Sequence, residues 1–341
     1  MTTPASFPFT PVPAARRLLV TGAEGFLGRG LVQAVAGNAN LQLVLATDVR
    51  TVPPERQLRG VLHRTLDVRD AHAVSALVAE HRIDTVVHLA SIVTPGKWTT
   101  RSMEYAVDVE GSRHIIDACV QHGVRHLVVS SSGAAYGYHP ENAPWITEDH
   151  PLRGHAQFAY AQHKRMVEEM LAEARARHPE LQQTVFRIGT ILGDRVDNQI
   201  TALFEKRRLL AIAGSDSPFV FVWDDDVIGA MRHAISGLAP AGCFNLAGDG
   251  ALPIAEIAQR LGKSLRVLPA GLLRTALAWG AKLGLTRYGP EQLDFLRYRP
   301  VLLNTALKER FGYVPGKSSA EAFEAWVRAR EAQGRPVRAR A

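Results

Sequence analysis

The chain has 341 residues, 46% of them hydrophobic and 21% charged, which is the balance of a globular protein with a sizeable apolar core. It contains no run of about 18 consecutive apolar residues, so we expect no membrane span. The formal net charge is +7, and much of the excess lies near the C-terminus without interleaved aromatic residues. We therefore expect a solvated basic tail and no nucleic-acid partner. The arginines concerned are Arg328, Arg330, Arg335, Arg338 and Arg340.

The two cysteines, Cys119 and Cys243, each lie in an apolar segment. Both are predicted to be small core residues, neither a disulfide nor a metal pair, which is typical of a protein of the reducing cytoplasm. We expect no metal site. Residues 1–17 are rich in Pro and Thr and lack a basic region followed by an apolar run, so no signal peptide is predicted.

The first half of the chain alternates short apolar runs with amphipathic helical patterns. Such alternation predicts βαβ units and a Rossmann-type, doubly wound parallel sheet of the α/β class. The apolar runs are nearly continuous, as expected for a sheet covered by helices on both faces. The predicted strands are 17–21, 42–47, 85–89, 126–130 and 183–188, and the predicted helices are 26–36, 71–81, 102–121 and 160–176.

The second half is less regular and predicts a small C-terminal substrate lobe. We divide the chain into a flexible extension (1–15), an NAD-binding domain (16–190), a mainly substrate-binding lobe (191–330, with 223–250 returning to the core) and a basic tail (331–341). One apolar stretch, 272–285, is broken by Arg274, Lys282 and glycines. It is either a buried helix or an interfacial one, and burial is the commoner case.

A glycine-rich segment follows the first predicted strand. Gly22, Gly25 and Gly28 have the spacing G-x-x-G-x-x-G between a strand and a helix. Glycines there permit a tight turn and a close approach of the backbone to a pyrophosphate, which the amides of the helix N-terminus then bind. The alternative is a glycine-rich turn without a ligand, but the position directly after a buried strand favours a dinucleotide site.

Asp48 ends the second predicted strand, and Asp67 follows a further strand expected just before it. Asp48 follows Gly28 by 20 residues and is placed to accept hydrogen bonds from the adenosine ribose. A carboxylate there repels a 2′-phosphate, so NAD is preferred to NADP. The nearby Arg50 counts against this preference, because its positive charge attracts a phosphate. The alternative is that Asp48 only begins a loop. Asp67 and Val68 are predicted to border the adenine.

Tyr160 and Lys164 are four residues apart in a helical pattern and therefore share one face of a helix. A nearby ammonium stabilises the phenolate and lowers the tyrosine pKa toward neutrality, so that Tyr160 exchanges a proton with a substrate hydroxyl. Ser132 ends a predicted parallel strand, where such sheets place their ligand groups, and it can hold the substrate oxygen. The alternatives are a chance match on a surface helix and a serine-rich loop.

Taken together, TGAEGFLG (21–28), Asp48, DV (67–68), HLAS (88–91), SSSGAAYG (130–137) and YAQHK (160–164) resemble the extended short-chain dehydrogenase/reductase family. The order is similar to its NAD-dependent epimerase/dehydratase branch, which includes UDP-glucose 4-epimerase. The resemblance implies that Ser132, Tyr160 and Lys164 form the catalytic set and that Lys164 also binds the nicotinamide ribose. It further implies cofactor contacts from Phe26 and Leu27, a cofactor channel lined by His88, Leu89, Ala90 and Ser91, and a homodimer formed through helices near 102–121 and 160–176.

Several positions depart from the pattern of this family. Ser132-Gly133-Ala134 stands where dehydratases carry Thr-Asp-Glu, so we set dehydration aside. Thr190 stands where sugar epimerases have asparagine, and Asp108 stands where the family commonly has asparagine. Ser217-Pro218-Phe219 stands where an arginine meets the nucleotide diphosphate, and the nearby Lys206, Arg207 and Arg208 are the candidates to compensate. Ser132, Thr190 and Phe219 are the candidate substrate contacts.

The sequence therefore predicts an NAD-dependent enzyme that transfers a hydride at a secondary alcohol or ketone of a small molecule. A nucleotide-sugar epimerase is the leading hypothesis. A net dehydrogenase or reductase of a less polar compound is the alternative, favoured by the missing arginine. An NAD-binding protein without catalytic activity is a third reading, which the intact Ser132, Tyr160 and Lys164 disfavour.

Overall fold

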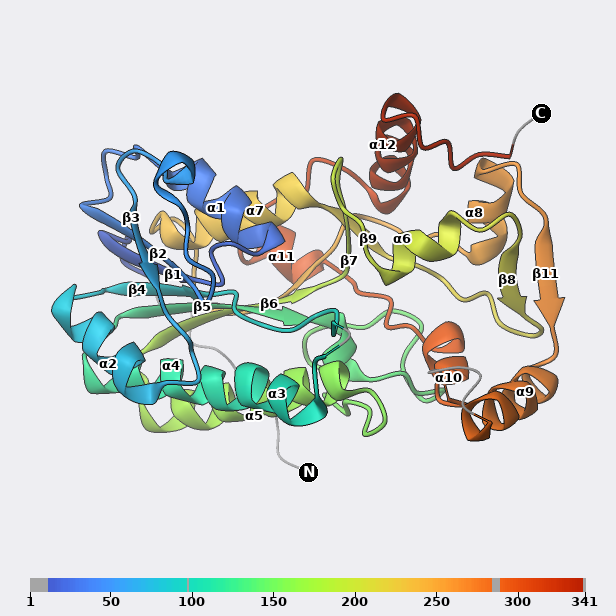
Figure 1. The fold of residues 1–341 in the computed structure, drawn as a ribbon, viewed down its shortest axis with the longest axis horizontal. Helices are drawn as coiled ribbons and strands as arrows, with labels where there is room; N and C mark the ends of the chain where they lie inside the picture. Colours follow the sequence, from blue (N-terminus) through green and yellow to red (C-terminus); the bar gives the residue numbers. More distant parts are fainter. Residues whose placement is uncertain (1–11, 97, 284–288, 340–341) are drawn as a thin grey trace.

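The computed structural model describes residues 12–96, 98–283 and 289–339. Within these residues, seven parallel strands form one sheet in the order β10-β6-β5-β4-β1-β2-β3 (Figure 1). Helices cover both faces of the sheet, so the predicted Rossmann-type fold is confirmed. The strands are β1 (Arg17–Thr21), β2 (Leu43–Asp48), β3 (Leu62–Thr65), β4 (Thr85–His88), β5 (His126–Ser132), β6 (Gln182–Ile188) and β10 (Gly242–Leu246).

The sheet forms because its strands are apolar on both sides and each face packs against helices. On one face, α1 (Phe26–Val35) and α7 (Asp224–Ile235) bury side chains in a common core with β1 and β6. On the other face, α2 (Ala71–Glu80), α4 (Gly111–Gln121) and α5 (Ala159–Arg177) form a second core. Burial of this apolar surface is the main force that holds such layers together.

The strand order reverses between β1 and β4, because β2 and β3 continue from β1 in one direction and β5 and β6 from β4 in the other. Ligands of doubly wound sheets bind in the crevice outside the carboxyl ends of the strands at this point. The glycine loop follows β1, and the serine run ends β5. Both motifs therefore come to the same edge of the sheet.

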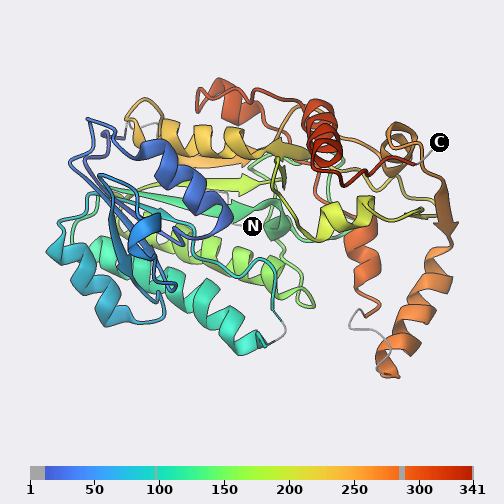
Figure 2. The same ribbon diagram turned by 45° about the horizontal axis from the view of Figure 1, so that its top comes forward.

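The C-terminal lobe is built from two small parallel sheets and short helices (Figure 2). Its aromatic core contains Phe204, Phe219, Phe221, Phe323 and Trp326, all of them fully buried. The elements are β7 (Thr190–Leu192) with β9 (Phe221–Trp223), β8 (Leu209–Ile212) with β11 (Leu265–Leu268), α6 (Gln199–Phe204), α8 (Ile254–Arg260), α9 (Ala270–Lys282), α10 (Gln292–Arg297) and α12 (Ser319–Ala332); α11 (Thr305–Glu309) contacts β10.

The chain ends are more closely packed than the sequence suggests. The basic tail is exposed over most of its described residues but is anchored, because Arg338 pairs with Glu324 at 3.0 Å and Val337 between the arginines is buried. At the other end, the predicted extension falls largely outside the described residues. Its last part packs on α7, since Val12 is buried and the Ala15 amide donates to Ile235 O at 2.9 Å. Charge and composition alone do not predict these local contacts.

Two helical predictions also need correction. The helix expected over 102–121 is divided into α3 (Arg101–Tyr105), a π-helical turn (Ala106–Glu110) and α4. Single-turn π-helices of this kind frequently occur at functional sites. The apolar stretch expected to be buried, 272–285, forms instead the exposed helix α9 over the part that is described.

Candidate active site

A cavity of about 800 Å³ lies at the carboxyl edge of the sheet, between the sheet and the C-terminal lobe. Segments that are distant in the sequence form its wall. The predicted site residues that line it are Gly22, Gly25, Phe26, Leu27, Gly28, Leu89, Ser91, Ser132, Tyr160, Lys164, Thr190 and Phe219. The glycine loop, the catalytic candidates and the substrate candidates thus share one cavity.

The glycine loop forms a cradle without room for side chains. Gly22 has φ +65°, and a Cβ built on it would lie 2.7 Å from Ala90 N. A Cβ on Gly28 would lie 2.2 Å from Gly22 O, so α1 packs directly on the turn. The first amides of α1 are consequently open to the cavity. This geometry fits a dinucleotide pyrophosphate.

Asp48 ends β2 beside this loop, and its carboxylate is engaged within the protein. Glu24 N donates to Oδ2 at 3.0 Å, and Arg50 donates to Oδ1 through its backbone N and its Nε, both at 3.0 Å. Burial raises the pKa of Asp48, but the hydrogen bonds from Arg50 and Glu24 outweigh it and hold the pKa below its usual value. Arg50 Nη2 also donates to Oδ2 at 3.4 Å, so the about four acceptor positions of the carboxylate are occupied, and a ribose hydroxyl would take the place of an Arg50 side-chain donor.

Other residues of the predicted cofactor set lie outside the cavity lining. Asp67 forms an ion pair with Arg69, whose hydrogen bonds lower the pKa of the carboxyl. Val68 is buried beneath α4, and Ala90 packs against the glycine loop. The channel role expected for His88 is not supported, because its buried ring hydrogen-bonds Thr21 Oγ1 at 2.7 Å and Ser112 Oγ at 3.0 Å. Burial, together with the charge of Lys164, lowers the pKa of His88 to about 3.

Tyr160 and Lys164 lie on the first turns of α5 and face the end of β5. Lys164 Nζ donates to Ser130 O at 2.9 Å and lies 5.5 Å from the centre of the Tyr160 ring. Ser132 Oγ accepts a hydrogen bond from Ala134 N at 3.1 Å, which fixes its side chain at the strand end. The backbone of β5 therefore anchors the ammonium next to the phenol, as the proton-transfer hypothesis requires.

A buried ion pair between α5 and β6 stabilises the end of β5. Glu168 of α5 pairs with Arg187 of β6 at 2.8 Å and accepts a hydrogen bond from Ser131, the neighbour of Ser132. Arg187 Nη1 also donates to Tyr136 Oη at 2.8 Å. Removal of one partner of such a buried pair leaves an uncompensated charge, so this network stabilises the position of the catalytic segment.

The environment of Asp108 was not predicted from the sequence. This residue lies in the π-helical turn, almost fully buried, and accepts hydrogen bonds from Ile92 N at 2.8 Å and Ser91 Oγ at 2.9 Å. Its other oxygen lies 3.1 Å from Nδ1 of His163, which precedes Lys164 on α5. Asp108 thereby joins the cavity wall to the catalytic helix. The occurrence of Asp at a position where the family has Asn was the one sequence feature that marked it.

Arg299, which was also not predicted as a site residue, lines the cavity in the C-terminal lobe. Its guanidinium lies 3.8 Å from the centre of the Phe219 ring and 5.0 Å from that of Phe295. Nη1 donates to Leu296 O at 3.2 Å, and Nε is buried without a hydrogen-bond partner within the described structure. Burial lowers the pKa of Arg299 to about 9. An arginine from a distant segment thus lies against Phe219, just before β9, where the arginine of the family is absent.

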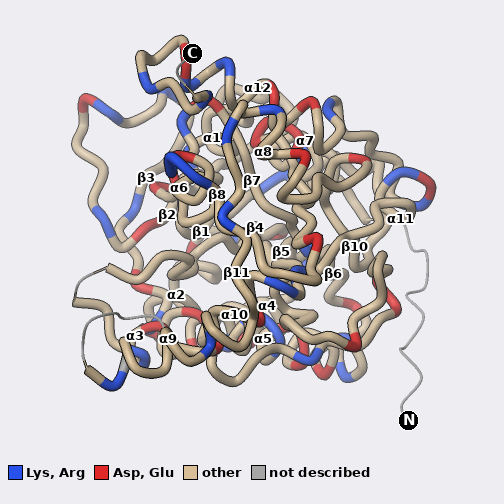
Figure 3. The backbone as a smooth tube through the Cα atoms, turned by 90° about the vertical axis from the view of Figure 1, so that its right-hand side faces the viewer, with Lys and Arg blue, Asp and Glu red and all other residues tan. Residues whose placement is uncertain are grey.

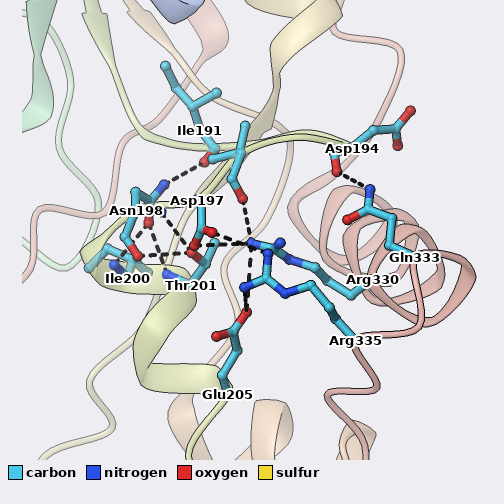
Figure 4. Close-up of polar contacts among 11 residues, drawn as sticks. Ile191, Asp194, Asp197, Asn198, Ile200, Thr201, Glu205, Arg330, Gln333 and Arg335 are labelled. Carbon is cyan, nitrogen blue, oxygen red and sulfur yellow. Dashed lines mark hydrogen bonds and ion pairs between the residues drawn. The ribbon is translucent and has the colours of Figure 1, made fainter.

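The loop before α6 forms another part of the cavity wall, with residues 195–200 among the lining. Helix α12 and the tail hold this loop (Figure 4). Arg330 is buried, donates to Val196 O at 2.8 Å and lies 3.3 Å from Asp197 Oδ1. Arg335 lies 3.2 Å from the other oxygen of that carboxylate. Two basic residues expected to be solvated therefore position a wall of the site.

The family model described as the NAD dependent epimerase/dehydratase family matches residues 18–246. The chain belongs to this family. The resemblance inferred from the motifs is confirmed, and so is NAD as the cofactor type.

Relatives of this epimerase/dehydratase family member include an uncharacterized protein of Mycobacterium tuberculosis, 25% identical over 319 residues, which are 92% of this chain and 84% of that protein. The UDP-glucose 4-epimerase of Neisseria meningitidis is 29% identical over 185 residues, 52% of this chain and 54% of that enzyme. Among solved structures, the Bordetella bronchiseptica enzyme WbmG in complex with NAD and UDP has a TM-score of 0.71 at 18% sequence identity. The matched residues are 95% of this chain and 96% of the WbmG chain. At that identity the structural likeness establishes the fold of this family member.

Proposed function

We propose that the protein is an NAD-dependent oxidoreductase that acts on a nucleotide sugar, in the manner of a 4-epimerase. The observation that carries the proposal is the continuity of the cavity, which runs from the glycine cradle past Ser132 and Tyr160 to Arg299. A cofactor site, a proton-transfer pair and a cation for an anionic substrate group thus occur in one cavity, in the order that this chemistry requires.

Within this proposal, Tyr160 is the group that exchanges a proton with the substrate hydroxyl. Lys164, held by Ser130 O, lies beside the phenol ring of Tyr160. Ser132 donates to the same substrate oxygen and fixes its distance from Tyr160. NAD, when bound, supplies the acceptor and donor of the hydride.

The cradle of Gly22, Gly25 and Gly28, with Phe26 and Leu27 beside it, would hold the pyrophosphate of NAD. Asp48 would accept from the adenosine ribose, Asp67 and Val68 would border the adenine, and Leu89, Ala90 and Ser91 would follow the nicotinamide half. Lys164 would reach the nicotinamide ribose, since its ammonium has donors besides the one given to Ser130.

Arg299 would bind the diphosphate of the substrate. Its Nε is buried without a hydrogen-bond partner in the described structure, and its half-buried guanidinium has no ion-pair partner among the described residues. A partly buried cation of this kind is stabilised by the arrival of an anion. Arg195 lines the same cavity from the loop before α6 and would supply a second cation at the mouth.

A net dehydrogenase of a less polar compound is the second candidate. It is favoured by the aromatic wall of the cavity, where Tyr138 packs edge-on against Phe158 and Phe295 at 5.1 Å. Such a wall would accept an apolar ring or chain as readily as a sugar. The two candidates differ in whether the cofactor stays bound throughout turnover.

Cofactor retention tests the proposal. An epimerase reduces and reoxidises the same NAD within each turnover, whereas a dehydrogenase must exchange it. The protein purified without added cofactor is expected to release NAD(H) on acid treatment, and UDP-sugars are expected to raise its melting temperature. An apo preparation that ignores UDP-sugars but forms NADH steadily with a lipophilic secondary alcohol would establish the second candidate instead.

A further inference from the structure

Helix α9 (Ala270–Lys282) presents an apolar stripe to solvent. Leu272, Ala276, Trp279 and Leu283, in the turn that follows, have the i, i+4, i+7, i+11 spacing of one helix side. The exposed fractions are 61% for Leu272, 60% for Trp279 and 63% for Leu283. A contiguous group of large exposed apolar side chains marks an interaction surface rather than a solvated face.

The stripe is not the side by which α9 attaches to the lobe. Leu273, Leu277 and Gly280 are half-buried and lie on a different side of the helix. Arg274 pairs with Asp294 of α10 at 3.5 Å, which ties α9 to the neighbouring helix. Figure 2 shows α9, in orange, extending away from the body of the lobe. The stripe is therefore free for a partner.

The charges that α9 itself carries are positive. From Ala270 to Lys282 the helix contains Arg274 and Lys282 and no acidic residue. Arg274 pairs with Asp294 of α10, whereas Lys282 Nζ lies 5.8 Å from the centre of the Trp279 ring, at the border of the stripe. Figure 3 views the molecule from the end that carries α9, with Lys and Arg in blue. A helix with Leu and Trp on one side and basic residues as its own charges is typical of binding at a membrane surface.

We propose that α9 docks the protein on the surface of an anionic phospholipid membrane, with the apolar stripe inserted between the headgroups. A second copy of the chain is a poorer partner, because a two-fold contact between α9 helices would oppose this uniformly basic segment to itself. Anionic headgroups supply the opposite charge and attract basic residues near the membrane surface. None of the helices in the described part of the chain is long and apolar enough to cross a membrane.

Docking through α9 would bring one side of the active-site cavity close to the membrane. Helix α10 contacts α9, and its Gln292 and Phe295 line the cavity. The membrane-facing helix and the cavity wall are thus adjacent. This inference stands on α9 itself and does not depend on which substrate the cavity binds.

Vesicle sedimentation tests the proposal directly. The full chain is expected to sediment with vesicles of phosphatidylcholine containing phosphatidylglycerol, to bind far less to phosphatidylcholine alone, and to dissociate as salt is raised. The double variant Leu272→Ser/Trp279→Ser should lose about tenfold or more in affinity, because two large apolar side chains no longer insert. The matched control Leu238→Ser/Val314→Ser removes side chains of 78% and 68% exposure elsewhere and should bind like the wild type.

Light scattering in solution and Trp fluorescence complete the test. Addition of anionic vesicles should shift the emission of Trp279 to shorter wavelength, and the shift should be absent in Trp279→Phe. If the wild-type protein does not sediment with anionic vesicles, or binds neutral vesicles equally well, the proposal is overturned. A dimer that the α9 double variant converts to monomer, while the control variant stays dimeric, would assign the stripe to a second copy instead.

Discussion

His163 Nδ1 lies 3.1 Å from Asp108 Oδ2, and both side chains are almost completely buried next to Lys164. Burial raises the pKa of Asp108, but the hydrogen bond from His163 and the charge of Lys164 outweigh it and keep the carboxyl ionised. Because the other oxygen accepts from Ser91 and Ile92, Asp108 links the wall of the cofactor cavity to the helix that carries Tyr160. It is a positioning residue and, in addition, a fixed negative charge in the site.

The first prediction concerns this charge. Asp108→Asn should lower the pKa of the ionisable groups nearby, so the acid limb of the pH profile of kcat/KM should move to lower pH by up to about one unit. The comparison is with Ser91→Ala, which removes a hydrogen bond to Asp108 but no charge and should leave the limb in place. Equal pH profiles for wild type and Asp108→Asn would show that Asp108 has only a structural role.

The second prediction concerns proton transfer. Tyr160→Phe removes the hydroxyl and keeps the ring, so turnover should fall by about a hundredfold or more while NAD affinity barely changes. Lys164→Ala should reduce both, because the lysine faces the cofactor side as well as the phenol. Steady-state kinetics and calorimetry of NAD binding separate the two effects. Near-full activity of Tyr160→Phe on the true substrate would exclude it as the proton-transfer residue.

The third prediction concerns cofactor choice. NAD(H) should bind about tenfold or more tightly than NADP(H), a difference of about 1.4 kcal/mol, because Asp48 repels a 2′-phosphate. Asp48→Asn should reduce this ratio, since it removes the repulsion and releases Arg50 from its ion pair at 3.0 Å. Calorimetric titration of both cofactors gives the ratio. A wild-type preference for NADP(H) would mean that Arg50 governs the pocket.

Local sequence patterns were sufficient to predict the sheet and the main parts of the site. A buried strand followed by glycines, and a tyrosine four residues before a lysine on a helix, each specify their geometry within a few residues. Contacts such as Asp108 with His163 or Arg299 with Phe219 join segments that are far apart in the chain. No periodicity encodes these contacts, because they depend on how α5 packs beside the π-helical turn and on how segments of the lobe pack on one another. The exposure of α9 was misjudged for the same reason, because its apolar composition resembles that of a core helix.

The fourth prediction concerns stability. Burial, with the nearby charges of Asp225 and Asp194, raises the pKa of Asp224 to about 6 from its ordinary 3.8. The folded state therefore binds the proton of Asp224 more tightly than the unfolded state does. This proton stabilises the folded state at low pH, and that stabilisation is lost as the pH rises from 3.8 to about 6. Above pH 6, Asp224→Asn should have a larger free energy of unfolding than the wild type, and the difference should shrink toward pH 4. Urea denaturation across this range checks it, with Asp117→Asn, an exposed acid on α4, as the control. A difference that does not vary with pH would refute the assignment.

The last prediction concerns Arg299 and the choice between the two candidate functions. Arg299→Leu keeps an apolar side chain against Phe219 and Phe295 but removes the only cation that the described structure stacks on either ring. If the substrate carries a diphosphate, its KM should rise by about tenfold to a hundredfold, since a buried charge-assisted contact is lost, while NAD affinity stays unchanged. Arg207→Leu, an exposed arginine outside the cavity lining, is the matched control and should leave KM unaltered. A variant that binds UDP-sugars as the wild type does, or that gains activity on lipophilic alcohols at no cost in KM, would favour the dehydrogenase, because an apolar substrate gains nothing from a buried guanidinium.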